Sequence, residues 1–327
     1  MASSSREINV LLVGPRRSGK TTLAGLMGHP RFNGVPEGLR LRASGIRDAL
    51  KRVKRLEDAV NRAAPWSPID VDSIITRTPA DRLFRYTYTL ECPATAPPAA
   101  KFLDLITIHM LDIGGLTFEE GPERVREVLG RDGMSLHDVD IVMFVVDAVA
   151  LVEAFGVARE KAMAVDSVSA VISKVLELKE IPWIFAVLTR CETYLLEGKD
   201  HRQRLAEARD WWAERVGLRR LIPASVEVLF QCWWIPVFTT GCLRVRKAEI
   251  AKGDGGDGNG GADLRPIFER TERSFAPRFT AAVYGIVLKV AIEIARERRG
   301  GVGNVPGLVF ASPQAPIEGS PRFRRGN

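Results

Sequence analysis

Residues 14–21 of the chain, GPRRSGKT, match the phosphate-loop pattern G-x-x-x-x-G-K-[ST] at every fixed position. The apolar run INVLLV at 8–13 predicts a buried strand before them, and TTLAGLM at 21–27 predicts the start of a helix after them. A glycine loop between a strand and a helix N-terminus presents backbone N–H groups that bind phosphate. We therefore expect Lys20 to contact the β- and γ-phosphates of a nucleotide, and the Thr21 hydroxyl to ligate Mg²⁺.

Composition is that of an ordinary globular protein, with 46% hydrophobic and 27% charged residues among 327. The net charge of +7 permits contact with nucleic acid or an anionic membrane surface but requires neither, and the sequence gives no clear sign of nucleic-acid binding. The longest apolar stretch, 281–294, contains Lys289 and Glu293 and is too short and too charged to span a bilayer. The N-terminal MASSSRE lacks an apolar segment and the four cysteines lack a C-x-x-C pair, so we expect a cytoplasmic protein with reduced thiols.

Strand-like and helix-like segments alternate along the chain, which predicts an α/β fold in three layers: a mostly parallel central sheet with helices on both faces. The segment 83–91 alternates apolar and polar residues, so it is expected to be an edge strand or an antiparallel strand. The candidate strands are 8–13, 83–91, 102–111, 140–147, 183–188 and 234–238. The candidate helices follow Lys20 and cover 120–131, 151–178, 202–216 and 268–298.

One domain is expected over residues 1–299, with a disordered tail at 300–327 that is rich in Gly, Pro and Arg. Residues 31–80 form a helical insertion after the first helix, in which apolar residues recur at helical spacing among lysines and arginines. We interpret this amphipathic stretch as a packed helix with a solvated cationic face, in preference to a membrane or partner site. The glycine- and aspartate-rich run 252–262 predicts a flexible loop, and a C-terminal helix is expected over 263–299.

A carboxylate suited to the magnesium shell ends the third candidate strand. The segment LITIHMLDIGG places Asp112 at the C-terminal end of that strand, before two glycines. Because the carboxyl ends of parallel strands meet at the edge where the phosphate loop lies, Asp112 is the predicted Walker B acid. Gly115 permits close approach, and we expect its N–H to reach a γ-phosphate. Asp147 ends the next strand and is interpreted as a structural residue or a helix cap.

Two later segments carry groups suited to a purine base. TRCE at 189–192 follows the strand at 183–188, and TTG at 239–241 follows the last candidate strand. TRCE resembles the [NT]-K-x-D motif that guanine-nucleotide-binding proteins carry at this place, with Arg for Lys and Glu for Asp. The resemblance implies that the Glu192 carboxylate accepts hydrogen bonds from the guanine N1–H and exocyclic amine, and that Arg190 stacks on the purine face. In such proteins a small-residue loop at the place of TTG would donate a backbone N–H to the guanine O6.

The order GPRRSGKT, DIGG, TRCE and TTG, each at a strand end, resembles the P-loop GTPases of the translation-factor and Ras-like superfamily over roughly residues 7–241. The resemblance implies GTP and GDP binding with Mg²⁺, two nucleotide-sensing switch segments, and a signalling role through a protein effector or activator. The large first insertion is similar to that of bacterial double-GTPases from conflict and signalling systems. The positions that match these motifs, and so are implied to contact the nucleotide, are Gly14, Ser18, Gly19, Lys20, Thr21, Thr22, Asp112, Gly115, Thr189, Arg190, Glu192, Thr240 and Gly241.

The chain departs from this family at the position that orients the attacking water. Hydrolysing members carry a glutamine just after the glycine of the second motif, and this chain carries Leu116. A leucine side chain cannot position water, so we predict slow intrinsic hydrolysis unless a partner or another residue assists; Glu119 and Glu120 are candidates. Arg16 and Arg17 occupy the tip of the phosphate loop, where they either stabilise charge in catalysis or point to solvent.

The first switch segment should offer a threonine to Mg²⁺, and Thr76 and Thr78 are the candidates, with Thr78 preferred. A phosphate loop alone does not select a base, so two alternatives to a GTP-dependent switch stay open. One is a P-loop ATPase or phosphotransferase. The other is a scaffold that keeps a nucleotide for stability and does not turn it over.

Overall fold

The computed structural model describes residues 6–33, 40–74, 82–91, 106–179, 182–218, 233–251 and 263–297. The predicted flexible loop at 252–262, the predicted tail at 300–327 and the candidate switch threonines Thr76 and Thr78 lie outside these residues.

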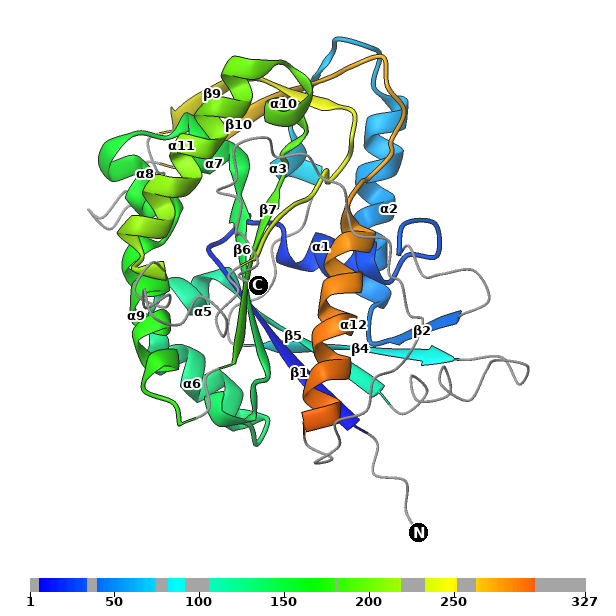
Figure 1. Cartoon of the computed structure of the whole chain (residues 1–327). Coiled ribbons are helices and arrows are strands. Elements are labelled where there is room, and N and C mark those ends of the chain that lie inside the picture. The colour runs from blue at the N-terminus through cyan, green and yellow to red at the C-terminus, as the bar shows by residue number, and fades with distance from the viewer. Residues whose placement is uncertain are drawn as a thin grey trace, which may run out of the picture.

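A mostly parallel seven-stranded sheet forms the centre of the molecule, which confirms the predicted α/β class (Figure 1). Its strands lie in the order β2–β4–β5–β1–β6–β7–β8. Five of the strands run parallel to one another: β5, β1, β6, β7 and β8. Strand β4 is antiparallel to both of its neighbours, in agreement with its alternating sequence pattern, and β2 forms the edge beside it. The strands are β1 Arg6–Val13, β2 Arg40–Ser44, β4 Leu83–Glu91, β5 Ile106–Ile113, β6 Ile141–Asp147, β7 Trp183–Thr189 and β8 Trp233–Pro236.

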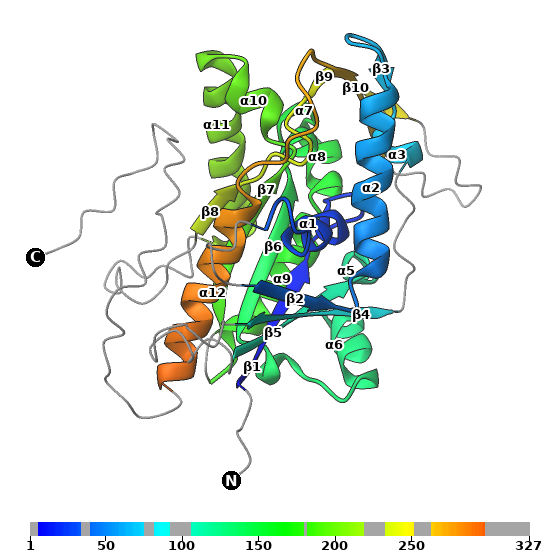
Figure 2. The same cartoon turned by 90° about the vertical axis from the view of Figure 1, so that its right-hand side faces the viewer.

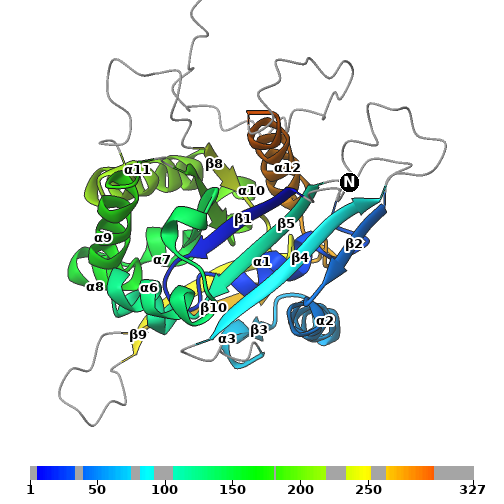
Figure 3. The same cartoon turned by 90° about the horizontal axis from the view of Figure 1, so that it is seen from below.

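Helices cover both faces of this sheet, as Figure 3 shows from below. Successive side chains of a strand point to opposite faces, so Val10 and Leu12 of β1 enter one core and Leu11 and Val13 enter the other. Helices α1 (Lys20–Met27) and α12 (Thr280–Glu297) pack on the first face. Helices α6 (Pro122–Arg131), α9 (Val165–Leu176) and α11 (Lys199–Arg215) pack on the second.

The insertion after α1 is held to the domain by an amphipathic helix, α2 (Arg47–Arg62), which lies beside α1 (Figure 2). Its buried residues are Ala49, Val53, Leu56 and Val60, which share one face at helical spacing. The lysines and most arginines of α2 are exposed, so the predicted packed helix with a solvated cationic face is confirmed. The insertion also contains strand β2, which the sequence did not suggest.

Among the described residues, no helix combines the length and apolarity needed to cross a membrane.

Two predicted helices were wrong in extent. The helix expected over 151–178 is three shorter ones, α7 (Ala148–Glu153), α8 (Gly156–Ala162) and α9. The first break occurs because Ala154 and Phe155 are extended, and the second because Ala164 adopts a left-handed conformation with φ 45° that a continuous helix cannot accommodate. The helix expected over 263–299 is preceded by a strand, β10 (Asp263–Arg270), and α12 begins only at Thr280. Strand β10 pairs with β9 (Leu243–Ala251) and with β3 (Pro68–Ile69) of the insertion in a second, antiparallel sheet. This sheet joins two segments that are far apart in the sequence.

Candidate functional site

The phosphate-loop sequence connects β1 to α1, as predicted. Gly14 has φ 154°, and a Cβ at this position would lie 2.4 Å from the carbonyl oxygen of Val145 in β6. No other residue fits this close approach, so Gly14 fixes the path of the loop over the end of the sheet. Helix α1 begins at Lys20, which directs the first backbone N–H groups of the helix toward the loop.

Lys20 is buried inside the loop, with 6% of its surface exposed. Its Nζ donates hydrogen bonds to the carbonyl oxygens of Gly14 at 2.6 Å and of Pro15 at 3.0 Å. Burial lowers the pKa of Lys20 to about 8, against the opposing charges of Asp112 and Glu119. The ammonium group therefore lies in a cradle of neutral acceptors, where an anionic ligand would stabilise its charge.

Thr21 and Asp112 meet beside this lysine. The Thr21 hydroxyl donates to Oδ2 of Asp112 at 2.6 Å. The other carboxylate oxygen, Oδ1, is buried and has no hydrogen-bond partner among the described residues. Burial raises the pKa of Asp112, while the charge of Lys20 and the hydrogen bond from Thr21 oppose that shift. A hydroxyl and a carboxylate with an unsatisfied oxygen are hard oxygen ligands, which is the donor set that Mg²⁺ prefers.

In the described part of the chain, no cluster of three or more His, Cys, Asp or Glu side chains could hold a metal. A magnesium ion at Thr21 and Asp112 would therefore take its remaining ligands from phosphate oxygens and water, as is usual for Mg²⁺ bound with a nucleotide.

The segment at 189–192 is tied to the phosphate loop. The Thr189 hydroxyl donates to the carbonyl oxygen of Ser18 at 2.7 Å. Arg190 has φ 58°, and its guanidinium donates to the carbonyl oxygen of Arg17 at 3.1 Å and pairs with Asp147. Asp147 also accepts from the N–H of Val149 at 3.0 Å, which confirms it as the cap of α7. These bonds join the end of β7 to the phosphate loop.

Phe268 of β10 occupies a position over Arg190. The guanidinium carbon of Arg190 lies 5.6 Å from the centre of the Phe268 ring, within the range of a cation–π interaction. Phe268 is itself buried. The side chain expected to stack on a base is thus already oriented by an aromatic ring from the second sheet.

Glu192 begins helix α10 (Glu192–Leu196) and its carboxylate is buried against the TTG segment. Oε1 accepts from the N–H of Thr240 at 3.0 Å and from its hydroxyl at 2.8 Å, and Oε2 accepts from the N–H of Thr239 at 3.2 Å. Burial raises the pKa of Glu192, while these hydrogen bonds and its own backbone N–H oppose the shift. The two groups expected to recognise a guanine base therefore bind each other in this structure.

The second motif leads into a short helix, α5 (Gly115–Glu119), which packs on the phosphate loop. A Cβ on Gly115 would lie 2.5 Å from the backbone nitrogen of Arg16. Glu119, a candidate for positioning water, instead accepts from the Arg16 backbone N–H and from its Nε, both at 2.8 Å. Leu116 is 39% exposed and offers no hydrogen-bonding group. The sequence motif did not reveal the contact between α5 and the loop, because nothing in the motif indicates that Arg16 and Glu119 bind each other.

The other predicted ligands lie in the same region. Thr22 is buried in the first turn of α1, and Gly241 has φ 72°, with the carbonyl oxygen of Ala276 2.2 Å from the place of a Cβ. The structure thus brings together every described residue of the predicted nucleotide site at the C-terminal edge of the sheet. Thr78 is outside the described residues, so its role stays a prediction.

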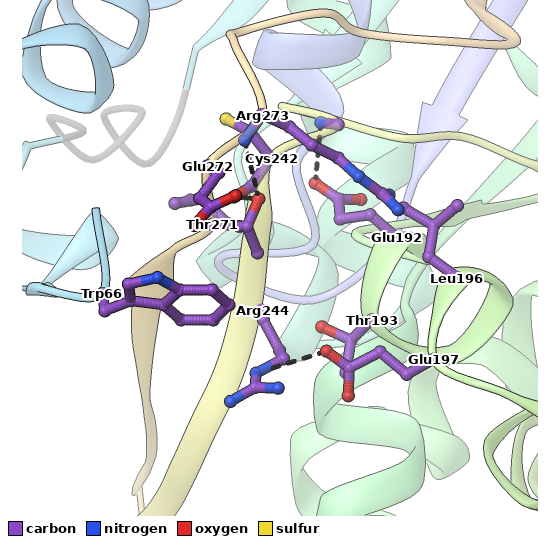
Figure 4. A pocket seen from close by; sticks show the side chains of 12 residues that line it. Trp66, Glu192, Thr193, Leu196, Glu197, Cys242, Arg244, Thr271, Glu272 and Arg273 are labelled. Carbon is purple, nitrogen blue, oxygen red and sulfur yellow. Dashed lines mark hydrogen bonds and ion pairs between the residues drawn. The ribbon is translucent and has the colours of Figure 1, made fainter.

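A pocket lies on the outer side of Glu192, between α10 and the second sheet (Figure 4). In it, Trp66 faces Arg244, whose guanidinium carbon is 5.4 Å from the indole ring and whose Nε is 3.2 Å from Oε1 of Glu197. The sequence did not predict this pocket, because its walls come from four separate segments of the chain. The lining residues are Trp66, Glu192, Thr193, Leu196, Glu197, Gly241, Cys242, Leu243, Arg244, Thr271, Glu272 and Arg273.

Comparison with known proteins gives only distant likenesses. No protein-family model matches the chain, and no curated protein matches it. Among solved structures, Toc33 from Arabidopsis thaliana in complex with Mg²⁺ and GMPPNP has a TM-score of 0.41 and 12% identity, over 88% of this chain and 85% of that chain. The GTPase-like domain of S. cerevisiae Ski7, bound to GTP, has a TM-score of 0.41 and 12% identity, over 89% of this chain and 51% of that one. At this level of similarity, neither a family nor an activity transfers to the chain.

Proposed function

We propose that the chain binds a guanine nucleotide with Mg²⁺ at residues 14–21 and acts as a regulatory switch with slow intrinsic hydrolysis of GTP. The observation that carries the proposal is the arrangement of Lys20, Thr21 and Asp112. A buried ammonium lies in a loop of backbone carbonyls, beside a hydroxyl–carboxylate pair that keeps one buried oxygen unsatisfied. A nucleotide phosphate would pair with the first, and a magnesium ion would satisfy the second.

Thr21 and Asp112 would hold the magnesium ion, and Thr78 is proposed as a further ligand from the first switch. When bound, Mg²⁺ neutralises charge on the β- and γ-phosphates. Lys20 supplies a second positive charge to the same phosphates. The backbone N–H group of Gly19, at the end of the loop, would help to orient them, whereas that of Ser18 donates to the carbonyl oxygen of Pro15 at 3.4 Å.

Guanine is the proposed base because Arg190 and Glu192 follow β7, whose last residue, Thr189, donates to the carbonyl oxygen of Ser18 in the loop. Arg190 is held close to the loop through Arg17, so a nucleotide with its phosphates at Lys20 would place its base within reach of this segment. A carboxylate has about four acceptor positions, and Oε2 of Glu192 accepts only one of the hydrogen bonds described above. This oxygen therefore has capacity for the guanine N1–H without loss of the contact with Thr239.

Slow hydrolysis is proposed because the residues at the positions expected to orient water are apolar or already paired; Glu120 pairs with Arg124 at 3.2 Å. Leu116 has no polar atom, and both carboxylate oxygens of Glu119 are bound to Arg16. A protein activator or effector is accordingly part of the proposal, since a partner would supply the missing polar group. Whether Arg17 stabilises charge on the phosphates stays a prediction.

A second candidate function is a P-loop ATPase or phosphotransferase without guanine selectivity. The mutual binding of Glu192 and Thr240 favours it, because the N–H expected to contact the guanine O6 already donates to the carboxylate. An adenine base requires neither of these contacts.

Titration with fluorescent GDP and ATP, with and without Mg²⁺, tests these proposals. Lys20→Ala should lose most affinity for both nucleotides, while the matched control Lys174→Ala, on the partly exposed side of α9, should retain it. Glu192→Ala should weaken GDP and leave ATP unchanged. Equal binding of GDP and ATP by the wild type would support the second candidate and contradict the guanine proposal. Unchanged affinity in Lys20→Ala would contradict any function based on this loop.

A further inference from the structure

The exposed cations of helix α2 lie along one side of it. Successive residues of an α-helix are turned by about 100°, so positions 47, 51, 54, 55, 58 and 62 fall within roughly 100° of one another around the helix axis. The buried residues of α2 project from the opposite side, onto the domain. We call the exposed cations at these positions the α2 stripe: Arg47, Lys51, Lys54, Arg55 and Arg62. The stripe therefore points away from the protein.

Most of the charge of the α2 stripe is not neutralised by neighbouring carboxylates. Lys51 pairs with Asp48 at 3.3 Å. Within the described part of the chain, the other four cations of the stripe form no ion pair. Asp58 is the carboxylate that lies among them, so five cations and one carboxylate leave this side of the helix with a net charge of +4. At a rise of 1.5 Å per residue, the charge is spread along about 22 Å of the helix.

We propose that the α2 stripe holds the protein on a lipid surface that contains anionic headgroups. The proposal goes beyond the nucleotide-dependent switch and does not require it. A lysine or arginine close to such a surface is attracted by its negative potential, and the attraction falls off within about 10 Å at 0.1 M salt. Because the cations of the stripe lie on one straight ridge, they can reach the plane of the headgroups together. Anionic lipids move within that plane and can gather beneath the cations, so the surface needs no complementary shape.

The sides of α2 favour a membrane over a protein or a nucleic-acid duplex. Stable protein interfaces have an apolar core, and the large apolar side chains of α2 already pack on the domain. A duplex would enclose the helix in its major groove and face its sides as well as the ridge. The rotation of about 100° per residue places Asp48 on one side of the stripe and Glu57 on the other, where their charges would repel the phosphate backbones. A membrane contacts only the ridge.

The expected strength of the attraction follows from the number of cations. Each lysine or arginine close to an anionic surface strengthens binding by about fivefold. The stripe variant, in which Lys51, Lys54 and Arg55 are all replaced by alanine, should therefore bind about 100-fold more weakly than wild type. These side chains are exposed, so urea denaturation should show the same stability for the variant and the wild type.

Cosedimentation of the full chain with vesicles tests the proposal. Wild type should bind vesicles of phosphatidylcholine with about 30% phosphatidylserine at about 0.1 M salt, and should be released at about 0.5 M salt or by vesicles of phosphatidylcholine alone. The matched control removes the same number of charges from α8, α9 and α11, which lie on the other side of the molecule from α2 (Figure 3). This control combines Lys161→Ala, Lys174→Ala and Lys199→Ala, and it should bind the vesicles like wild type, because its loss of net charge lies away from the stripe.

Three outcomes would overturn the inference. The first is a wild-type protein that does not bind the anionic vesicles. The second is an equal loss of binding in the stripe variant and the control, since binding would then follow net charge alone. The third is tighter binding of a short duplex DNA than of the vesicles, lost in the stripe variant, which would assign the stripe to nucleic acid. If the stripe variant fails to fold, Lys54→Ala alone carries the same test, with an expected loss of about fivefold.

Discussion

Gly25, in the middle of α1, lies directly against the inserted helix α2. A Cβ at this position would be 2.6 Å from the carbonyl oxygen of Ala49 and 2.8 Å from its carbonyl carbon. It would also lie 2.8 Å from Cγ2 of Val53. The Val53 side chain has alternative rotamers, but the Ala49 backbone can retreat only if α2 moves. A glycine at position 25 is therefore what allows α2 to pack onto the helix that carries Lys20 and Thr21.

The substitution Gly25→Ala has two opposing effects on the free energy of unfolding. Alanine favours a helix over glycine by about 1 kcal/mol. Against this, the two helix backbones must separate by roughly 1 Å to reach an ordinary carbon–carbon spacing, and overpacking of this kind costs about 1–3 kcal/mol. Because two of the three close atoms are backbone, we expect a cost at the upper end of that range. The net result should be a destabilisation of about 2 kcal/mol.

Gly285 provides the matched control for this prediction. It lies in the interior of α12, and a Cβ there would meet no atom within 4 Å. Gly285→Ala should therefore stabilise the protein by roughly 0.5–1 kcal/mol. Urea denaturation followed by circular dichroism measures both effects. A Gly25→Ala variant as stable as wild type, or stabilised like Gly285→Ala, would refute the close packing of α2 on α1.

Three further predictions concern the site and the insertion. Thr189→Val removes the hydroxyl that donates to the carbonyl oxygen of Ser18, so it should lower the free energy of unfolding by about 1–3 kcal/mol, as urea denaturation measures it, and should weaken nucleotide binding. Stability and affinity equal to those of the wild type would contradict the role of this hydrogen bond. Burial raises the pKa of Glu192 above 4.5, so this carboxylate should be protonated at a higher pH than an ordinary glutamate. The ratio of GDP to ADP affinity should therefore fall at that higher pH in the wild type and be independent of pH in Glu192→Gln. Because the folded state binds this proton more tightly than the unfolded state, the group adds stability to the protein as the pH falls. Leu56→Ala in the buried face of α2 should cost about 2–5 kcal/mol in thermal or urea unfolding, whereas Lys54→Ala on the exposed face should change stability by at most about 0.5 kcal/mol.

Much of the fold was predictable because its determinants are local. The strand, loop and helix around residues 14–21 are encoded by adjacent residues, and the apolar runs that became β6 and β7 mark buried strands wherever they occur. The amphipathic period of α2 likewise needs no knowledge of its partner. The prediction failed at Ala164, where a left-handed residue interrupts an otherwise helical pattern, and at β10, whose short apolar run fits a strand or a helix equally well.

The sequence by itself determined that a phosphate loop lies between a buried strand and a helix, and that acidic residues end the neighbouring strands. Only the tertiary structure decided which groups satisfy one another at that edge: Glu192 binds the backbone of Thr240, and Glu119 binds that of Arg16. The physical reason is that hydrogen bonds between residues about 50 or 100 positions apart depend on the distances between packed elements, which no local pattern records. The loop motif therefore indicates a phosphate site, whereas the contacts around it indicate how that site could distinguish its ligands.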